Sequence, residues 1–338
     1  MIYSISKHIL TFKKPAKTSR NTFLEREIYL VKFEENGLKG IGEAAPLAKL
    51  SIDDVENYEE MLHHFCQQIC EGGQLQELDL ERFPSIKFGL ETALLNLKQQ
   101  QANKIFDCSF FAGKPIKING LVWMNELEAM YDEALQKIES GFSCIKFKVG
   151  THDFDAECRL LEKIRKQFST SKVEIRLDAN GAFLVDEALI QLKELAKFDI
   201  HSLEQPIKKS SEPEWDSLAK ICHESAIDIA LDEELIGLNI NIYGEKLINQ
   251  TKPKYLILKP NLIGGFDAAD HWVKLAKKHE IDWWATSALE SNVGLNAIAQ
   301  WVSQYDTKMP QGLGTGSLYE NNIAMPLQIV SEFLRYNV

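Results

Sequence analysis

The fold is decided by five apolar stretches that each end at a charged residue: SCIKFKVG (143–150), VEIRLDANG (173–181), IHSLEQP (200–206), IDIALDEE (227–234) and KYLILKP (254–260). The charged residues at their ends are Lys148, Asp178, Glu204, Asp232 and Lys259, which follow one another at steps of 30, 26, 28 and 27 residues. One strand, one helix and two short loops fill a step of this length. We therefore predict repeated β/α units that bring these charges to one common edge.

Three further β-like stretches raise the number of predicted strands to eight: IKINGLVWM (116–124), IDWWATS (281–287) and QGLGTG (311–316). Helices are predicted between them near 125–141, 153–168, 185–197, 212–224, 235–248, 266–279 and 293–304. Eight strands that alternate with helices favour a closed α/β barrel. A doubly wound open sheet is the alternative, but no G-x-G-x-x-G motif follows any of the strands.

The first part of the chain follows a different pattern. Alternating stretches joined by Asn36-Gly37 predict antiparallel strands with a tight hairpin. A capping pattern at Ser51 and Asp54 predicts a helix that runs to about Cys70, and a second helix is expected over 85–101. We therefore expect an α+β domain over 1–113, the barrel over 114–316, and a C-terminal segment, 317–338, that returns to the first domain.

Composition excludes several classes of protein. The net charge of −11 argues against a nucleic-acid partner. The sequence contains no stretch of 18 apolar residues, so we predict no membrane span. Six cysteines in 338 residues do not form a disulfide framework, and the first residues do not resemble a signal peptide. We expect a cytoplasmic protein. Cys66 and Cys70 lie near His63 and His64, so a zinc site is conceivable there, but small core side chains on an amphipathic helix are the favoured interpretation.

The charged strand ends predict a metal site. Asp178, Glu204 and Asp232 would converge from adjacent strands, and mutual repulsion would raise their pKa values unless a cation lay among them. An all-oxygen ligand set favours Mg²⁺, with Mn²⁺ as a substitute.

Lysines flank these acids in the chain. Lys146 and Lys148 precede them and Lys259 follows, so that with a dication the site is net positive and suits an anionic small molecule. A lysine beside a metal and a second lysine has a lowered pKa and can act as a base, which implies abstraction of a proton α to a carboxylate. A single charge at a strand end is usually a structural ion pair. Lys146 could merely neutralise a carboxylate, and Arg176 is expected to orient Asp178 more than to touch substrate.

At these residues the chain resembles the enolase superfamily, in its muconate-lactonising subgroup. The matching motifs are Lys146-Phe147-Lys148, Asp178-Ala179-Asn180, Glu204-Gln205-Pro206, Asp232-Glu233 and Lys259. The resemblance implies that the three acids bind Mg²⁺ and that Lys148 and Lys259 are catalytic residues on opposite faces of the substrate. It also implies a modified TIM barrel, (β/α)₇β, covered by an N-terminal α+β capping domain.

Within the subgroup, three stretches resemble the o-succinylbenzoate synthases: EAAPL (43–47), KPNLIGG (259–265) and TSALES (286–291). Asn292 departs from the pattern, because a second serine is commoner there. The resemblance implies a Mg²⁺-dependent syn-dehydration of 2-succinyl-6-hydroxy-2,4-cyclohexadiene-1-carboxylate to o-succinylbenzoate, a step of menaquinone biosynthesis. The substrate-binding residues that we predict are Lys146, Arg176, Gly264, Gly265, Ser287 and Ser291. The capping loop at Thr18-Ser19-Arg20 is a further candidate from its position between two strands, although a plain surface turn is an equal alternative.

Two other functions use parts of the same pattern. An N-acylamino acid racemase or dipeptide epimerase needs the same two lysines, whereas a non-catalytic metal-binding barrel would need neither. An epimerase more often carries an acid pair after the last strand to hold an amine, and GTGSLYENN (314–322) offers none directly. Glu290 lies at a strand end but is expected to face away and pair with a cation. The oligomeric state stays open.

Overall fold

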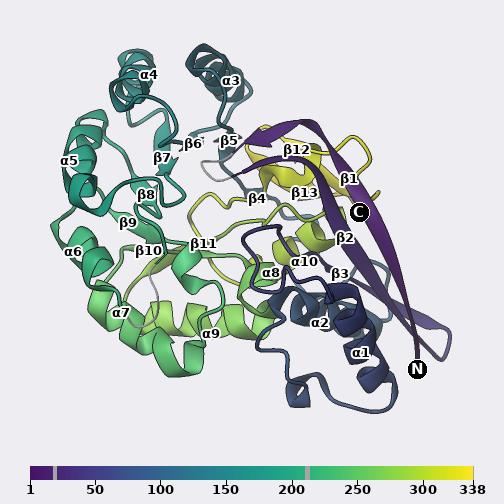
Figure 1. Ribbon diagram of the computed structural model, residues 1–338. Coiled ribbons are helices and arrows are strands. Elements are labelled where there is room, and N and C mark those ends of the chain that lie inside the picture. Colours follow the sequence, from purple (N-terminus) through teal and green to yellow (C-terminus); the bar gives the residue numbers. More distant parts are fainter. Residues whose placement is uncertain (18–20, 210–213, 338) are drawn as a thin grey trace.

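The computed structural model describes residues 1–17, 21–209 and 214–337. Its first part is an antiparallel sheet of β1 (Ile2–Lys17), β2 (Thr22–Glu35) and β3 (Leu38–Ala44), in that order. The predicted hairpin is confirmed, because Glu35 pairs with Leu38 across a turn in which Asn36 and Gly37 both have positive φ. Helices α1 (Tyr58–Cys70) and α2 (Pro84–Gln99) cover one face of this sheet (Figure 1).

Close packing joins α2 to the sheet. A Cβ atom on Gly42 of β3 would lie 2.0 Å from the carbonyl oxygen of Gly89, and one on Gly89 would lie 2.8 Å from the Cβ of Ala44. Only glycine at both positions lets the helix backbone approach the strand this closely. The alternating side chains Tyr29, Val31 and Phe33 fill the core beneath the helices.

The predicted start of the first helix was wrong. The Ser51 hydroxyl accepts a hydrogen bond from the backbone N–H of Leu47, and the Asp54 carboxylate accepts one from the N–H of Lys49, so both side chains stabilise a turn. The helix begins at Tyr58. Asp53 instead accepts bonds from the backbone N–H and hydroxyl of Ser85 in the first turn of α2.

The barrel is a curled sheet of seven parallel strands in the order β11-β10-β9-β8-β7-β6-β5, surrounded by helices (Figure 1). The strands are β5 (Gly120–Val122), β6 (Cys144–Lys148), β7 (Glu174–Asp178), β8 (Ser202–Glu204), β9 (Ile229–Leu231), β10 (Tyr255–Leu258) and β11 (Asp282–Ala285). The helices are α3 (Leu127–Glu139), α4 (Phe154–Gln167), α5 (Val185–Leu195), α6 (Asp216–Glu224), α7 (Glu245–Thr251), α8 (Pro260–Ile263), α9 (Gly265–Lys278) and α10 (Asn292–Val302). The α/β barrel fold with an N-terminal capping domain is therefore confirmed.

Alternation along the strands explains where the charges go. Ile145, Phe147, Ile175 and Leu177 belong to the large apolar core between the sheet and its helices. The intervening Lys146, Lys148, Arg176 and Asp178 consequently point to the opposite face, inside the barrel.

The predicted eighth strand over 311–316 is reduced to two bridging residues. Gln311 pairs in parallel with Ile118, and Gly312 pairs with Thr286, so these two residues close the gap between the ends of the seven-stranded sheet. The chain then turns into a short 3₁₀ helix, Gly314–Ser317, which ends the pairing.

Three further predictions need correction. The stretch 116–124 is divided, because β4 (Ile116–Lys117) pairs with β13 (Phe333–Tyr336), which pairs with β12 (Leu327–Val330), and only β5 joins the barrel. The helix predicted over 235–248 is interrupted, because Gly237 has a φ of +71° and the Asn239 side chain accepts bonds from the N–H groups of Asn241 and Ile242. Helical structure resumes at Ile240. The helix predicted over 212–224 begins at Asp216, and residues 210–213 lie outside the described part.

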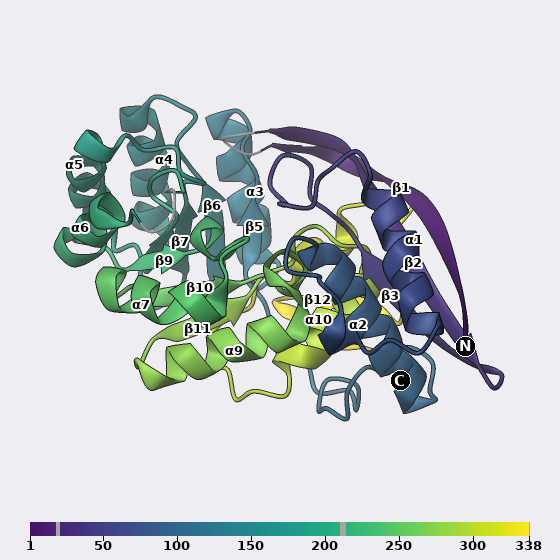
Figure 2. The same cartoon turned by 60° about the horizontal axis from the view of Figure 1, so that its bottom comes forward.

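The C-terminal segment contacts both parts of the molecule. Phe12 of β1 pairs with Tyr319, and the backbone N–H of Lys13 donates to the carbonyl of Leu318. The hairpin β12–β13 pairs with β4 (Figure 1), and the yellow C-terminal part of the chain lies between the barrel and the capping domain in the turned view of Figure 2. The boundaries 1–113, 114–316 and 317–338 stay predictions. Within the described ranges, no helix combines the length and the apolar character needed to cross a bilayer.

Candidate active site

Six buried charges meet at the carboxyl ends of the barrel strands, and we call them the strand-end cluster: Lys146, Lys148, Asp178, Glu204, Asp232 and Lys259. The strand register places Lys148, Asp178 and Glu204 at the same height along the barrel, because Lys148 pairs with Asp178 and Asp178 pairs with Glu204. The Nζ atom of Lys146 lies 2.8 Å from Asp178 Oδ2 and 2.6 Å from Glu204 Oε2. The Nζ atom of Lys148 lies 2.6 Å from the same Asp178 oxygen, and Lys259 donates to Asp232.

The acids of this cluster differ in protonation. Burial opposes the charge of Asp178, but Lys146 and Lys148 outweigh it and hold the pKa of Asp178 well below its usual range. Burial, followed by the neighbouring charge of Asp178, raises the pKa of Glu204 to about 8. The lysines therefore do not compensate Glu204 as fully as they compensate Asp178.

The two predicted catalytic lysines also differ. Burial lowers the pKa of Lys148, and the positive charges of Lys146 and Lys259 lower it further against the pull of Asp178. For Lys259, the charges of Asp232, Glu204 and Asp178 overcome the effect of burial, and the pKa is raised. Lys148 is thus the lysine that releases its proton more readily, while Lys259 keeps its charge.

Two side chains that the sequence prediction missed complete the surroundings of Lys148. Asn180 Oδ1 accepts a hydrogen bond of 2.7 Å from Lys148 Nζ, and Asn180 Nδ2 donates one of 3.0 Å to Glu233 Oε1. Asn180 occurs in the quoted Asp178-Ala179-Asn180 motif, and Glu233 follows Asp232 directly. Their positions beside motif residues were the signal from which the sequence could have predicted them as site residues.

The acids suit a cation in their chemistry. Among the described residues, neither Glu204 Oε1 nor Asp232 Oδ1 has a hydrogen-bond partner, although both atoms are buried. Buried oxygens without a donor are costly unless a cation or a water contacts them. In the arrangement described, however, no group of three or more His, Cys, Asp or Glu side chains is spaced to hold one metal ion. Ammonium groups of the lysines lie between the carboxylates instead.

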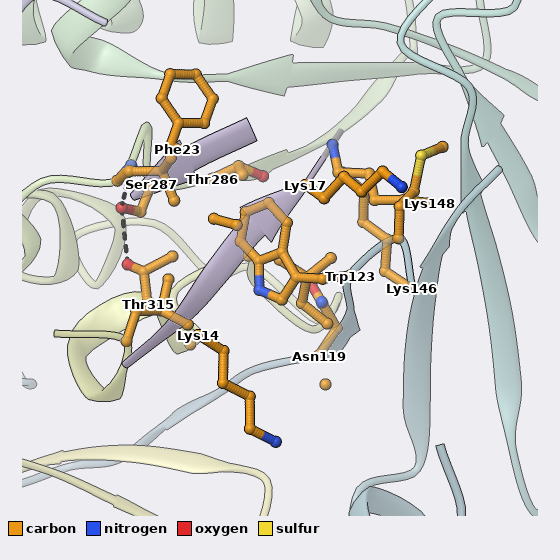
Figure 3. Close-up of a pocket in the computed structure, with 18 of the residues that line it drawn as sticks. Lys14, Lys17, Phe23, Asn119, Trp123, Lys146, Lys148, Thr286, Ser287 and Thr315 are labelled. Atoms are coloured by element: carbon orange, nitrogen blue, oxygen red, sulfur yellow. Dashed lines mark hydrogen bonds between the residues drawn. The ribbon is translucent and has the colours of Figure 1, made fainter. Parts of the chain in front are cut away.

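The cluster opens into a cavity of about 930 Å³ between the barrel mouth and the capping domain. Lys146, Lys148 and Lys259 of the strand-end cluster line this cavity. The capping domain contributes Lys13, Lys14, Lys17 and Lys49 to its wall. Figure 3 shows the Trp123 indole between the lysines of β6 on one side and the hydroxyls of Ser287 and Thr315 on the other. A cavity rich in lysine suits an anionic ligand, and Trp123 adds an apolar face.

Ser287 lies in this wall as predicted. Its hydroxyl donates to Glu290 Oε2 at 2.5 Å and accepts from Thr315 Oγ1 at 2.8 Å. Thr315 also lines the cavity and was missed, because nothing marks one threonine in a glycine-rich turn. Glu290 is fully buried and bonds Ser287, whereas the sequence prediction paired it with a cation.

Ser291 is directed elsewhere. It is fully buried, and its backbone N–H and hydroxyl both donate to Glu43 of β3, at 2.8 and 2.5 Å. Glu43 also accepts from the N–H of Gly294. The carboxylate of a capping-domain residue thus caps the first turn of α10, and Ser291 does not line the cavity.

Gly264 and Gly265 are absent from the cavity wall as well. The following backbone N–H groups, of Phe266 and Asp267, donate to the carboxylate of Glu91 on α2, at 2.6 and 3.2 Å. A Cβ on Gly265 would lie 2.2 Å from Glu91 Oε2, so the glycine makes room for this contact. The N-terminus of α9 therefore binds an acid of the capping domain.

Arg176 does not line the cavity. Arg176 is buried deeper in the barrel, where it donates to Glu174 and to the Pro310 carbonyl and lies 4.2 Å from the centre of the Trp284 ring. Thr18, Ser19 and Arg20 lie outside the described residues. Cys66 is buried in the capping-domain core, as the favoured interpretation of the cysteines expected.

Comparison with known proteins identifies the family. Residues 129–334 match the family described as "Enolase C-terminal domain-like", and residues 5–97 match "MenC, N-terminal domain". This chain belongs to the enolase superfamily. Membership in the enolase superfamily implies a divalent metal, typically Mg²⁺, and the buried oxygens of Glu204 and Asp232 that lack a hydrogen bond among the described residues fit that requirement.

Individual relatives within the enolase superfamily differ in similarity. The chain is 39% identical, over 95% of both chains, to a protein of Desulfotalea psychrophila named o-succinylbenzoate synthase. The crystal structure of MenC from that organism has a TM-score of 0.85 at 37% identity and covers 98% of this chain and 99% of its own. An L-Ala-D/L-Glu epimerase of Bacillus subtilis is 24% identical over 89% of this chain and 86% of its own.

Proposed function

We propose that this chain catalyses the syn-dehydration of 2-succinyl-6-hydroxy-2,4-cyclohexadiene-1-carboxylate to o-succinylbenzoate, in the cytoplasm and as a step of menaquinone biosynthesis. The observation that carries this choice is the identity of 39% over 95% of both chains to a protein named o-succinylbenzoate synthase. The substrate is an anionic small molecule, which suits the lysine-lined cavity. Nucleic acid and membrane have no part in the proposal.

Lys148 and Lys259 have different roles in the proposed reaction. Lys148, whose pKa is lowered, removes the proton from the ring carbon that carries the carboxylate. Lys259 lines the same cavity from β10, with three strands between it and Lys148 in the sheet, and its retained positive charge stabilises the anion that forms. The protonated Lys148 then returns the proton to the departing hydroxyl, the C–O bond breaks, water leaves and the ring becomes aromatic.

We propose that Asp178, Glu204 and Asp232 hold one Mg²⁺, for which Mn²⁺ can substitute. When bound, the ion would withdraw electron density from the ring carboxylate and make the neighbouring proton more acidic. Lys146, between Asp178 and Glu204, balances their charge. Substrate contacts by Lys146, Ser287 and Thr315 are proposed because these residues line the cavity. The positions of Arg176, Gly264, Gly265 and Ser291 favour structural roles.

An L-Ala-D/L-Glu epimerase or N-acylamino acid racemase activity is the second candidate. The relative from Bacillus subtilis favours it, and the lysine pair is compatible with either reaction. A dipeptide brings an ammonium group, which needs an acceptor in the cavity. Asp132 and Glu133 of α3 line the cavity and could supply one.

Parallel assays of one purified preparation test the choice. One assay follows loss of the cyclohexadiene chromophore, and the other follows deuterium exchange at the α-carbon of a panel of dipeptides and N-succinylamino acids. We expect kcat/KM for dehydration to exceed that for exchange by at least about 10³-fold, since a site built around one set of polar contacts leaves them unpaired with the wrong substrate. Faster exchange on any member of the panel would overturn the assignment.

A further inference from the structure

The loop that follows Lys148 is fixed by one buried carboxylate. Glu157, in the first turn of α4, is only 3% exposed. Its Oε1 accepts hydrogen bonds from the backbone N–H groups of Gly150, Thr151 and His152, at 2.8, 3.2 and 3.2 Å, and its Oε2 accepts a second contact of 3.0 Å from Gly150. Three successive N–H groups that converge on one point form an anion-binding concavity, which here holds an acid of the same chain.

Gly150 makes this geometry possible. Its φ is +94°, and a Cβ at this position would lie 2.5 Å from the Cβ of Ala182 in the loop after β7. The preceding residue, Val149, donates its N–H to the carbonyl of Asp178. The end of β6 is therefore held on one side by the neighbouring strand and on the other by Glu157.

The same loop reaches the cavity wall. His152 Nε2 hydrogen-bonds the Asn125 carbonyl at 2.7 Å, and Thr151 Oγ1 donates to Met124 Sδ at 3.1 Å. Both Met124 and Asn125 line the cavity, whereas Glu157 does not. Glu157 thus connects α4, the end of β6 and the loop between β5 and α3 without contacting the space that substrate would occupy.

We infer that Glu157 is a positioning residue for Lys148: by holding the N–H groups of Gly150, Thr151 and His152, it fixes the strand end that carries the lysine. This inference rests on the role proposed above for Lys148. The Nζ atom of Lys148 lies between Asp178 Oδ2, at 2.6 Å, and Asn180 Oδ1, at 2.7 Å, so a shift of the strand end would misalign it with the proton it removes. A displacement of about 1 Å is enough to cost about 10²-fold in rate.

The test compares Glu157→Gln with wild type and with a matched control, Glu162→Gln. Glutamine keeps the size of the side chain but loses one acceptor and directs an amide N–H₂ toward backbone donors. Glu162 lies on the same helix, is half exposed and, within the described part of the chain, pairs only with Lys166. Rates are measured below each variant's Tm and expressed per folded molecule.

For Glu157→Gln we expect kcat to fall about 10- to 100-fold with KM within about twofold, the pattern of an interaction needed in the transition state. The primary isotope effect with an α-deuterated substrate should rise, because proton removal becomes more limiting. Glu162→Gln should match wild type. A normal kcat in Glu157→Gln, a loss carried by KM alone, or an unchanged isotope effect beside a lower kcat would overturn the inference.

This experiment tests the role of Glu157 separately from the proposed function. The wild-type rates on the cyclohexadiene and on the dipeptide panel report the reaction. The ratio of variant to wild type, on whichever substrate loses its α-proton, reports the role of Glu157. If wild type proves to be an epimerase, the proposed function fails, while a lower exchange rate in Glu157→Gln still supports the positioning role.

Discussion

The strand-end cluster and the contact between capping domain and barrel both bury carboxylates, but they compensate them differently. Glu43 and Glu91 cross from the capping domain and accept bonds from the backbone N–H groups that begin α10 and α9. In the strand-end cluster lysine side chains contact all three acids, and Asp178 also accepts a bond from the backbone N–H of Asn180. Glu204 and Asp232 each keep one buried oxygen without a hydrogen bond among the described residues.

The difference separates acids that hold the fold together from acids that we propose bind a metal ion. Backbone donors cannot move away, so Glu43 and Glu91 are permanent parts of the structure. Ammonium groups on flexible stems can rearrange when a ligand arrives, and unpartnered oxygens leave room for a cation. Buried charges that the protein itself does not fully satisfy are typical of functional sites.

The largest effect is expected from the strand-end cluster. Lys148→Ala should lower kcat by about 10²–10⁴-fold, the usual range for loss of a general base. Lys148→Arg should be nearly as slow, because arginine keeps the charge but does not lose its proton at neutral pH. Steady-state kinetics of the two variants check this. Near-normal turnover by the arginine variant would make Lys148 an electrostatic residue and not the base.

The next prediction concerns stability without metal. Glu204→Gln should raise the Tm of chelator-treated protein, because it removes a buried acid whose pKa burial and Asp178 have raised to about 8. The same variant should lose activity. Differential scanning calorimetry at pH 9, where Glu204 is ionised, gives the clearest comparison with wild type. A lower Tm in the variant would mean that Glu204 is a structural acid like Glu43.

Glu43→Gln should have the opposite effects, a lower stability and an unchanged activity. It replaces one of the two carboxylate oxygens, which together accept three buried hydrogen bonds, with an N–H₂ group that cannot accept, and leaving a buried donor unpaired costs about 1–3 kcal/mol of unfolding free energy. Urea unfolding measures the loss. Turnover per folded molecule should be retained below the new Tm, since Glu43 does not line the cavity. If Glu43→Gln were as stable as wild type, Glu43 would not be a structural acid, and the distinction from the acids of the strand-end cluster would fail.

These two groups also differ in how readily the sequence reveals them. Asp178, Glu204, Asp232 and the two lysines that we propose as catalytic end apolar strands, so alternation and spacing were enough to predict that they lie together. Glu43 and Glu91 act across the two domains, and nothing in their local sequence shows which helix each will cap. The pairing of Gln311 and Gly312 involves too few residues to show a periodic pattern, and so the eighth strand was overestimated.

The smallest expected effect is a change in pH dependence. Burial, against two backbone hydrogen bonds, raises the pKa of Glu91 from 4.5 to about 7. The folded state therefore favours its neutral form, and the contribution of Glu91 to stability falls as pH rises between these values. Between pH 4.5 and pH 8, the unfolding free energy of wild type should therefore fall relative to that of Glu91→Gln. A difference that is constant over this range would contradict the raised pKa.

Calorimetric titration of Mg²⁺ into chelator-treated protein compares the two regions most directly. We predict that wild type and Glu43→Gln each bind one ion per chain, and that Glu204→Gln shows no measurable binding at the same concentrations. This result would assign the unpartnered oxygens to a cation and the backbone-bound acids to the fold. Equal binding by Glu204→Gln and wild type, or no binding by wild type, would contradict the separation of functional from structural carboxylates.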